Sequence, residues 1–426
     1  MSSRCVITGS GALCGSGAAP GAILDAIVEG RSAVAPIRRW DASNWPRRYA
    51  AEVADLDAHK LLGDRKILKL IRRTDVFGLY AAARAIDAAA FTAYRETLDE
   101  PANIAFAEAT GIYVGSGGGG YSSQYDFLPL LDATKGSDEA FGQQLAEMVS
   151  PMWLLTSLPN NVLCHVGIRH DLKGSNGCIT HHSTGSALAL VEGAWALREG
   201  DAQRVVVVGH DTMIEPQGVL FYHSAGLLAR EQIRPFDAAR DGSLLGEGAG
   251  ALVVEGEVSA RARRASVLGE YLGGGTAAEG EGLLAIRDDG DGVERAIALA
   301  LADAGLTADD VGMIVAHGNG TDQSDASEAR ALARVFGADM PPVTAFKWAT
   351  GHLLSASAIL DVTLALEALR RDIVPGIPTF ETLDPALPPI AVSRQARRPR
   401  SDVALVVCRG FGGANAALLV RAAPTR

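Results

Sequence analysis

Residues 178–186, CITHHSTGS, carry the side chains best suited to nucleophilic chemistry. β-Branched residues lead into two histidines, His181 and His182, which are followed by Ser183 and then by an Ala/Leu-rich helical run. A hydroxyl at a strand-to-helix turn, beside imidazoles, is typical of a nucleophile site. Serine is equally a common helix N-cap, and the motif G-x-S-x-G is absent. The local pattern leaves Ser183 open between a nucleophile, a substitute for one, and a cap.

Short apolar runs alternate with longer Ala/Leu-rich stretches along the chain, which predicts strands and helices in turn. The strand runs are nearly all apolar, which is typical of strands covered by helices on both faces. The clearest strands are Cys5–Thr8, Gly111–Gly115, Arg204–Gly209, Ala249–Glu255, Met313–Ala316 and Ala404–Val407. The helical stretches include Ala19–Glu29, Asp75–Ala90, Gly185–Glu199, Asp291–Ala304, Asp325–Phe336 and Ser355–Arg371. The sequence therefore predicts a layered α/β architecture.

A weak internal symmetry divides the chain into two halves. The first half places a strand, a turn and a helix around Ser183. The second places a strand before His317 and ends in the glycine-rich run CRGFGGANAALLV. A charged run, SARARRAS, follows a strand near residue 260 and marks the border between the halves. We expect an N-terminal half over 1–258 and a C-terminal half over 259–426, packed as one body.

The composition excludes several classes of function. With 39 basic and 50 acidic residues the formal net charge is −11, which argues against a nucleic-acid binder held by phosphate contacts. The five cysteines show neither a C-x-x-C pair nor metal-ligand spacing. No apolar run approaches the roughly 18 residues of a membrane span, and the N-terminus enters a strand-like run rather than a secretory signal. We expect a cytoplasmic protein with no membrane span and no metal site.

Eight motifs follow one another in an order that points to a single family. They are VITGSGALCGSG, GIYVGSGGGG, SLPNNVLCHVGIRHDLKGSN, GDAQRVVVVGHD, RPFDAARDGSLLGEGAGALVVE, AHGNGTDQSDASEA, KWATGHLLSASA and GFGGAN. With these motifs the chain resembles the β-ketoacyl synthases, the condensing enzymes of fatty-acid and polyketide synthesis. The resemblance covers nearly the whole chain. It implies the thiolase-like fold, in which two similar βαβ-containing halves form α-β-α-β-α layers.

The resemblance identifies Ser183 with the position of the family's catalytic cysteine. Counting forward from Gly174 and back from Gly200 gives the same position. In the family, the cysteine thiolate accepts an acyl group from an acyl carrier protein, and the carbanion left when a malonyl-carrier loses CO₂ attacks that acyl group. A serine hydroxyl is far less acidic, and a helix dipole worth about 1 kcal/mol does not ionise it. Ser183 therefore needs a general base. The candidates are His317, His352, His181 and His182.

Two further histidine motifs match the family's decarboxylation site. His317 in AHGNGT and His352 in KWATGHLL correspond to the pair whose N–H groups hold the enolate oxygen. Lys347 lies five residues before His352 and matches the family's active-site lysine. Asp325 and Glu328 match the acidic pair that follows the first histidine motif. We expect these carboxylates to position the site rather than to react.

The resemblance also implies groups that stabilise charge and hold the substrate arm. The backbone N–H groups of Ser183 and Phe411 would form an oxyanion hole. Gly412 and Gly413 in the GFGG run would let the backbone fold closely beside it. The positions that contact pantetheine are Asn319 and Thr321. One of these two departs from the family, which has threonine at both.

A basic run interrupts the acidic chain between residues 60 and 73. A solvated helix face is one interpretation, but the family uses this region to receive its acidic carrier protein by charge complementarity. The expected docking residues are Lys66, Lys69, Arg72 and Arg73. No metal or organic cofactor is implied, because the phosphopantetheine of the acyl carrier protein brings the substrate. We expect a homodimer, or a heterodimer with a second family subunit.

The serine leaves three hypotheses about function. We favour a β-ketoacyl synthase-type protein of fatty-acid or polyketide biosynthesis that handles acyl- and malonyl-carrier thioesters, in which Ser183 is a natural variant or an engineered replacement. The second hypothesis is a non-condensing partner that resembles a chain-length factor, although such partners commonly lose the histidines that are present here. The third is a serine-dependent acyltransferase or hydrolase on the same scaffold, supported by the His-His-Ser cluster.

Overall fold

The computed structural model describes residues 4–117 and 125–424. Within them ten strands form one sheet in the order β10-β9-β11-β12-β8-β1-β7-β6-β4-β5, and β2 pairs with β3 separately. The strands are β1 (Cys5–Cys14), β2 (Val34–Pro36), β3 (Tyr49–Ala51), β4 (Thr110–Ser116), β5 (Asn176–Thr180), β6 (Arg204–Asp211), β7 (Gly248–Gly256), β8 (Gly269–Ala278), β9 (Met313–Val315), β10 (Val343–Thr344), β11 (Val403–Gly410) and β12 (Ala414–Ala422).

Helices cover both faces of this sheet, and each predicted strand and helix has a counterpart. The α-helices are α1 (Pro20–Val28), α2 (Ala58–Leu62), α3 (Arg73–Ala88), α4 (Phe91–Arg95), α5 (Glu100–Glu108), α7 (Leu128–Thr134), α8 (Asp138–Met148), α9 (Trp153–Ser157), α10 (Asn161–His170), α11 (Gly185–Glu199), α12 (Pro216–Ser224), α13 (Glu257–Ala262), α14 (Asp291–Ala304), α15 (Asp322–Phe336), α16 (Lys347–Thr350) and α17 (Ser357–Arg370). The predicted ends of α11 and α14 are the observed ones, whereas β1 continues six residues beyond the predicted Cys5–Thr8. Three single-turn 3-10 helices shape the site: η2 (His182–Thr184), η5 (Leu354–Ala356) and η6 (Phe411–Gly413).

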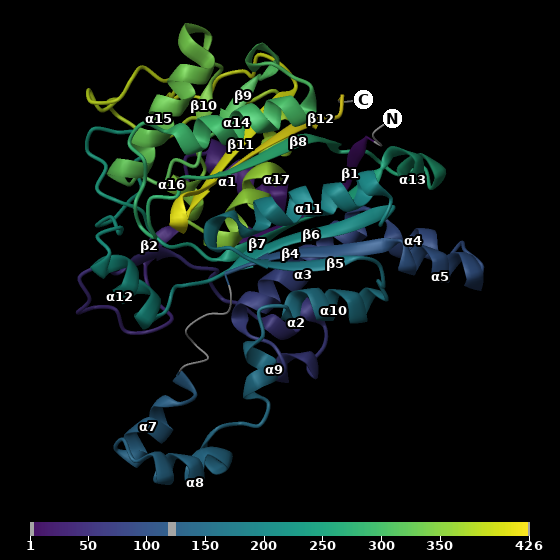
Figure 1. Cartoon of the computed structure of the whole chain (residues 1–426), viewed down its shortest axis with the longest axis vertical. Coiled ribbons are helices and arrows are strands. Elements are labelled where there is room, and N and C mark those ends of the chain that lie inside the picture. Colours follow the sequence, from purple (N-terminus) through teal and green to yellow (C-terminus); the bar gives the residue numbers. More distant parts are fainter. Residues whose placement is uncertain (1–3, 118–124, 425–426) are drawn as a thin grey trace.

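Two helices, α11 and α17, form the central layer of the molecule (Figure 1). Helix α11 packs on β4 and β6, whereas α17 packs on β7 and β11, so that the two helices separate the halves of the sheet. Helix α3 covers the outer face of β1, β6 and β7, and α14 covers β8 and β12. The predicted α-β-α-β-α layering is confirmed. Since α11 and α17 contact apolar strands, most of their residues are buried.

The strand order repeats on the two sides of the central β1–β8 pair. Outward from the centre it runs β1-β7-β6-β4-β5 on one side and β8-β12-β11-β9-β10 on the other. In each half a 3-10 turn leads into the central helix, and its first residue has a positive φ, 37° at His182 and 52° at Leu354. The predicted border between residues 258 and 259 falls within α13, which joins the halves. The place of the border itself stays a prediction.

Glycines allow α11 to begin directly against the sheet. A Cβ on Gly115 would lie 2.2 Å from the N atom of Ser186, and one on Gly209 would lie 2.5 Å from the Ser186 Cβ. No side chain fits at either position. The first turn of α11, and the serine just before it, are therefore held at the carboxyl ends of the parallel strands β4 and β6.

Candidate active site

Ser183 lies in the turn between β5 and α11, where its side chain is buried. Its Oγ is 2.8 Å from His182 Nδ1 and 3.4 Å from His352 Nε2. The N-cap position of α11 is Thr184. Because the hydroxyl of Ser183 contacts imidazole rings, and another residue occupies the cap, Ser183 is not the cap of α11.

A cavity of about 340 Å³ opens beside Ser183, within the usual size range of ligand pockets, about 300–1,000 Å³. The predicted site residues that line it are His182, Ser183, His317, His352, Asn319, Thr321 and Phe411. Asn319 Oδ1 accepts hydrogen bonds from the N–H and Oγ1 of Thr321 at 3.0 and 2.9 Å. Asn319, where the family has threonine, is therefore hydrogen-bonded to Thr321, where the family's threonine is retained. Lys347, Gly412 and Gly413 do not line the cavity.

Backbone donors fix the orientation of the two cavity histidines. The centroids of the His317 and His352 rings are 5.1 Å apart. The N–H of Leu354 donates to His352 Nδ1 at 3.1 Å, and the N–H of Arg409 donates to His317 Nδ1 at 3.3 Å. Since each Nδ1 accepts a hydrogen bond, each neutral ring carries its proton on Nε2. Both rings are therefore hydrogen-bond donors through Nε2–H.

The charge state of these rings follows from their surroundings. Burial holds the pKa of His317 and of His352 well below the usual range, and the positive charge of Lys347 lowers both further. Lys347 is itself buried, with its Nζ 3.0 Å from Asp361 Oδ2. Both histidines are neutral near pH 7. Sequence reasoning missed Asp361, although a lone carboxylate in the apolar run SAILDVTLAL was a usable signal.

The two carboxylates after His317 bind backbone rather than the cavity. Glu328 accepts hydrogen bonds from the N–H groups of His317 and Gly318 at 2.7 and 3.0 Å. Asp325 accepts one from the N–H of Gly320 at 3.1 Å. Both side chains are fully buried. This geometry supports the positioning role expected for the acidic pair, because it fixes the loop that carries the histidine.

The GFGG turn lies against the turn that carries the serine. A Cβ built on Gly410 would lie 3.5 Å from the N atom of Ser183. Gly413 has φ 66°, and a Cβ there would lie 2.6 Å from the Glu279 Cβ, so this close approach requires glycine. The amides of Ser183 and Phe411 thus belong to two turns in contact. The oxyanion hole that they would form stays a prediction.

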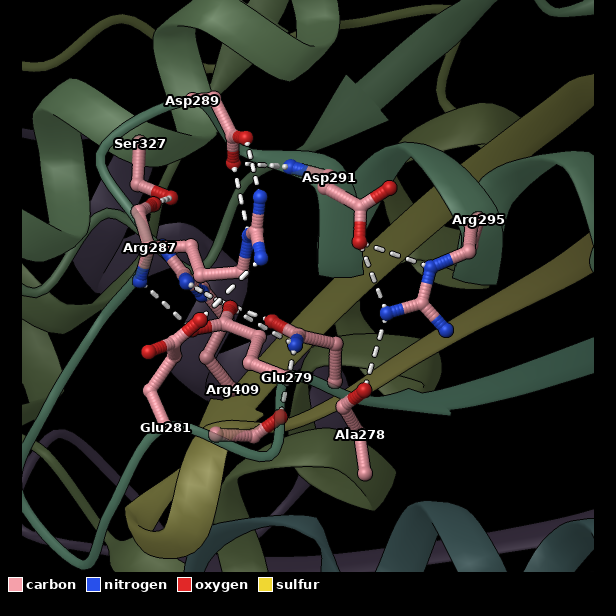
Figure 2. A network of polar contacts seen from close by, with 11 residues as sticks. Ala278, Glu279, Glu281, Arg287, Asp289, Asp291, Arg295, Ser327 and Arg409 are labelled. Carbon is pink, nitrogen blue, oxygen red and sulfur yellow. Dashed lines mark hydrogen bonds and ion pairs between the residues drawn. The ribbon is translucent and has the colours of Figure 1, made fainter.

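A buried polar network fixes the segment 279–291 beside this turn, as Figure 2 shows. Arg409 Nη2 donates to Glu279 Oε1 at 2.7 Å, and both side chains are buried. The N–H of Arg287 donates to Glu279 Oε2 at 2.8 Å, and Ser327 Oγ donates to the carbonyl of Arg287 at 2.7 Å. The network therefore ties a wall of the cavity to β11 and α15.

The two adjacent histidines point apart, although neither lies in a strand, since β5 ends at Thr180 and η2 begins at His182. His181 is exposed, with its Nδ1 2.7 Å from Thr184 Oγ1. His182 lines the cavity and its ring stacks on Phe411 at a centroid separation of 4.3 Å. The Nε2 of His182 is 2.5 Å from the Oη of Tyr222, on α12. Sequence reasoning missed Tyr222, for which no local signal exists.

No thiol replaces the missing cysteine in the described part of the chain. Cys408 Sγ is 3.0 Å from the carbonyl oxygen of Ser183, but burial raises the pKa of this thiol to about 12. Cys178 is half-buried in β5, and burial raises its pKa to about 11. Neither cysteine lines the cavity. The hydroxyl of Ser183 is therefore the group available as a nucleophile at this position.

Comparison with known proteins assigns the chain to a family. The family model for Beta-ketoacyl synthase, N-terminal domain, matches residues 2–260, and that for Beta-ketoacyl synthase, C-terminal domain, matches 268–381. The chain belongs to the β-ketoacyl synthase family. The 3-oxoacyl-[acyl-carrier-protein] synthase 2 of Synechocystis sp. is 32% identical over 423 residues, which is 97% of each chain. A putative polyketide beta-ketoacyl synthase 2 of Streptomyces coelicolor is 32% identical over 427 residues, 99% of this chain and 95% of that one.

Solved structures of the β-ketoacyl synthase family share the whole fold. A beta-ketoacyl synthase from Burkholderia phymatum matches with a TM-score of 0.87 at 26% identity, over 99% of this chain and 100% of that one. The ishigamide ketosynthase/chain length factor matches with a TM-score of 0.86 at 25% identity, over the same shares. The family and the fold expected from the sequence are confirmed.

In this β-ketoacyl synthase chain the basic run after residue 60 divides into two groups. The two lysines of the expected docking set are exposed. Arg73, however, pairs with the buried carboxylate of Glu247. Arg72 pairs with Asp126 at 3.2 Å and donates to the carbonyl of Thr156 at 2.8 Å. Both arginines therefore have partners within the chain, and carrier docking at the two lysines and the two arginines stays a prediction.

The described residues offer neither a metal-binding cluster nor a membrane-spanning helix. Over 4–117 and 125–424, no three His, Cys, Asp or Glu side chains gather in a way that could hold a metal ion. Over the same ranges, no helix combines the length and the apolar character that crossing a bilayer requires.

Proposed function

We propose that this β-ketoacyl synthase-type chain binds acyl- and malonyl-carrier-protein thioesters and promotes loss of CO₂ from the malonyl group, in fatty-acid or polyketide biosynthesis. One observation carries the proposal: His317 and His352 are neutral, buried, and oriented as Nε2–H donors at one cavity. Decarboxylation moves the electron pair of the breaking C–C bond toward the thioester carbonyl. Two N–H donors stabilise the enolate that forms.

The enolate carbanion then attacks an acyl group or takes up a proton. An oxygen ester on Ser183 is a poorer acyl donor to a carbanion than a thioester is, so condensation through Ser183 is slower than through a cysteine. Decarboxylation itself requires the two histidines and not the nucleophile. Release of CO₂ is therefore the step that reports on the proposed function most directly.

The substrates arrive on the phosphopantetheine arm of an acyl carrier protein, so no separate cofactor takes part. Asn319 and Thr321 line the cavity where the arm would bind. Lys66 and Lys69 are exposed and offer positive charge to an acidic carrier. The chain works in the cytoplasm as a homodimer, or as a heterodimer with a second family subunit.

The first test measures CO₂ released from malonyl-pantetheine. His317→Ala and His352→Ala each lower the rate about 10²–10³-fold, because each removes one donor to the developing oxyanion. His210→Asn is the matched control, since His210 is equally buried but does not line the cavity. It changes the rate less than twofold. A His317→Ala rate equal to that of the wild type would contradict the proposed role.

A second candidate function is that of a non-condensing partner subunit. The serine at the nucleophile position favours it, and one structural relative is a ketosynthase/chain length factor. The retained pair of donor histidines and the buried Lys347 argue against it. Co-purification with a cysteine-bearing family member, together with the absence of CO₂ release by this chain alone, would favour this second function.

A further inference from the structure

The Ser183 hydroxyl lies in a chain of hydrogen bonds, and the protonated nitrogen of each neighbouring ring decides which atom donates and which accepts. Because His352 carries its proton on Nε2, it donates toward Ser183 Oγ. The single hydroxyl proton of the serine is then available for the other neighbour, His182 Nδ1, at 2.8 Å. With Nδ1 as an acceptor, His182 carries its own proton on Nε2, which lies 2.5 Å from the Oη of Tyr222.

The other candidate bases are excluded by the same contacts. His317 and His352 have their Nδ1 atoms occupied by backbone N–H groups and present protonated Nε2 atoms to the cavity. His181 is exposed and its Nδ1 faces the hydroxyl of Thr184. Of the four histidines that the sequence offered as a base, His182 is the one with an acceptor nitrogen at the hydroxyl.

Three features hold His182 in this orientation. Its backbone has φ 37°, a left-handed conformation that is uncommon for residues other than glycine. Its ring stacks on Phe411 and contacts Tyr222 through Nε2. Burial, and to a lesser extent the neighbouring His181, lower the pKa of His182 to about 4, so the ring is neutral near pH 7.

We propose that His182 is the general base that loads an acyl group onto Ser183. The Ser183 oxygen forms a bond to the carbonyl carbon of an acyl thioester while its proton passes to His182 Nδ1. The C–S bond then breaks, the electron pair goes to the pantetheine sulfur, and that sulfur takes the proton from Nδ1. The products are an oxygen ester on Ser183 and a free pantetheine thiol. The step rests on the proposed function only in requiring that the cavity bind acyl thioesters.

The experiment follows loading of the purified full chain with the N-acetylcysteamine thioester of octanoic acid. Intact-mass spectrometry with peptide mapping gives the rate and the site of the adduct. The wild type gains one octanoyl group on Ser183, and Ser183→Ala gains none there. His182→Gln lowers the loading rate about 10²-fold, the lower end of the usual contribution of a general base, because a base with a pKa of about 4 is weaker than one whose pKa lies near the operating pH. The matched control His181→Gln changes only the exposed neighbour and leaves the rate within twofold.

A cysteine background separates a base from a structural support. A thiol ionises without help near neutral pH far more readily than a hydroxyl. The same His182→Gln change in a Ser183→Cys chain therefore lowers loading less than tenfold. Equal losses in the serine and cysteine backgrounds, no loss in the serine background, or no adduct on wild-type Ser183 would each overturn the proposal. Release of CO₂ from malonyl-pantetheine by the wild type is measured in parallel, so that either activity can fail while the other persists.

Discussion

The Ser183 hydroxyl has two imidazole neighbours with opposite roles in hydrogen bonding. His352 donates to it, and His182 accepts from it. A cysteine at this position would need neither contact in order to ionise, because a thiol has a much lower pKa than a hydroxyl. Exchange of one atom, sulfur for oxygen, thus transfers the task of activation from the nucleophile to the residue before it.

The rate of acyl loading onto Ser183 is expected to depend on pH through the charge state of His182. The titratable groups close enough to influence His182 are His181, Tyr222, His317 and His352. Because the neutral ring is the active form and its pKa is lowered to about 4, the loading rate is constant between pH 5.5 and 8. It falls as the pH decreases through about 4, since the protonated ring cannot accept the hydroxyl proton.

Initial rates of octanoyl loading at each pH check this dependence, with far-UV circular dichroism as a control for folding. In Ser183→Cys the rate instead rises with pH as the thiol ionises, around pH 8.5 in the absence of a perturbation. A wild-type midpoint near 6.5 would show that the ring titrates as an exposed histidine and would contradict the prediction.

Sequence motifs predicted which residues form the site, but they did not predict which side chains contact one another. Ser183, His317 and His352 were predicted from their motifs, and the structure brings all three to one cavity. Tyr222 lies far from them in the sequence, and its contact with His182 exists only through the path of α12. The partner of Arg73 escaped prediction for a related reason: a count of charges does not show that a carboxylate such as Glu247 lies buried beside it.

At the scale of elements, the connection between β8 and α14 is fixed to the GFGG turn by one buried ion pair. Glu279 accepts from Arg409 on β11, from Asn415 on β12 and from the backbone of Arg287. The Gly412 N–H adds a bond of 2.7 Å to the carbonyl of Leu283 in the same connection. Strands β11 and β12 and the connection itself therefore meet at one carboxylate, a contact that local sequence periodicity does not reveal.

Glu279→Gln tests how much the buried pair of Glu279 and Arg409 contributes to the free energy of unfolding. The change leaves the Arg409 guanidinium buried without its counter-charge, which typically costs about 3–5 kcal/mol of the free energy of unfolding. The midpoint of urea-induced unfolding falls accordingly. The control is Arg295→Ala, which removes the partly exposed pair with Asp291 in the same region (Figure 2) and costs within about 1 kcal/mol. Equal midpoints for the two variants would show that the buried pair does not anchor this connection.

At the scale of the whole molecule, helices α7 and α8 lie away from the sheet, and α9 leads back toward it (Figure 1). Their apolar side chains are unusually exposed, including Leu128, Leu131, Leu154 and Leu155. Contiguous exposed apolar groups commonly mark protein interfaces. We expect the second subunit of the proposed dimer to cover this arm, residues 127–158.

Leu154→Glu is the corresponding change, because it would place a charge inside that interface. Light scattering on the eluting peak is expected to show twice the mass of one chain for the wild type and a shift toward the single-chain mass for the variant. Val258→Glu, at an exposed valine on α13, leaves the mass unchanged. A Leu154→Glu protein that keeps the wild-type mass would exclude the arm from the interface.

The positive φ at both His182 and Leu354 shows that the two halves use the same turn for different tasks. Each half carries one left-handed residue at the first position of the turn that leads into its central helix. In one half the left-handed residue presents an imidazole to the nucleophile, and in the other its N–H orients His352. The left-handed turn thus does not depend on an imidazole side chain, since Leu354 adopts it in the second half.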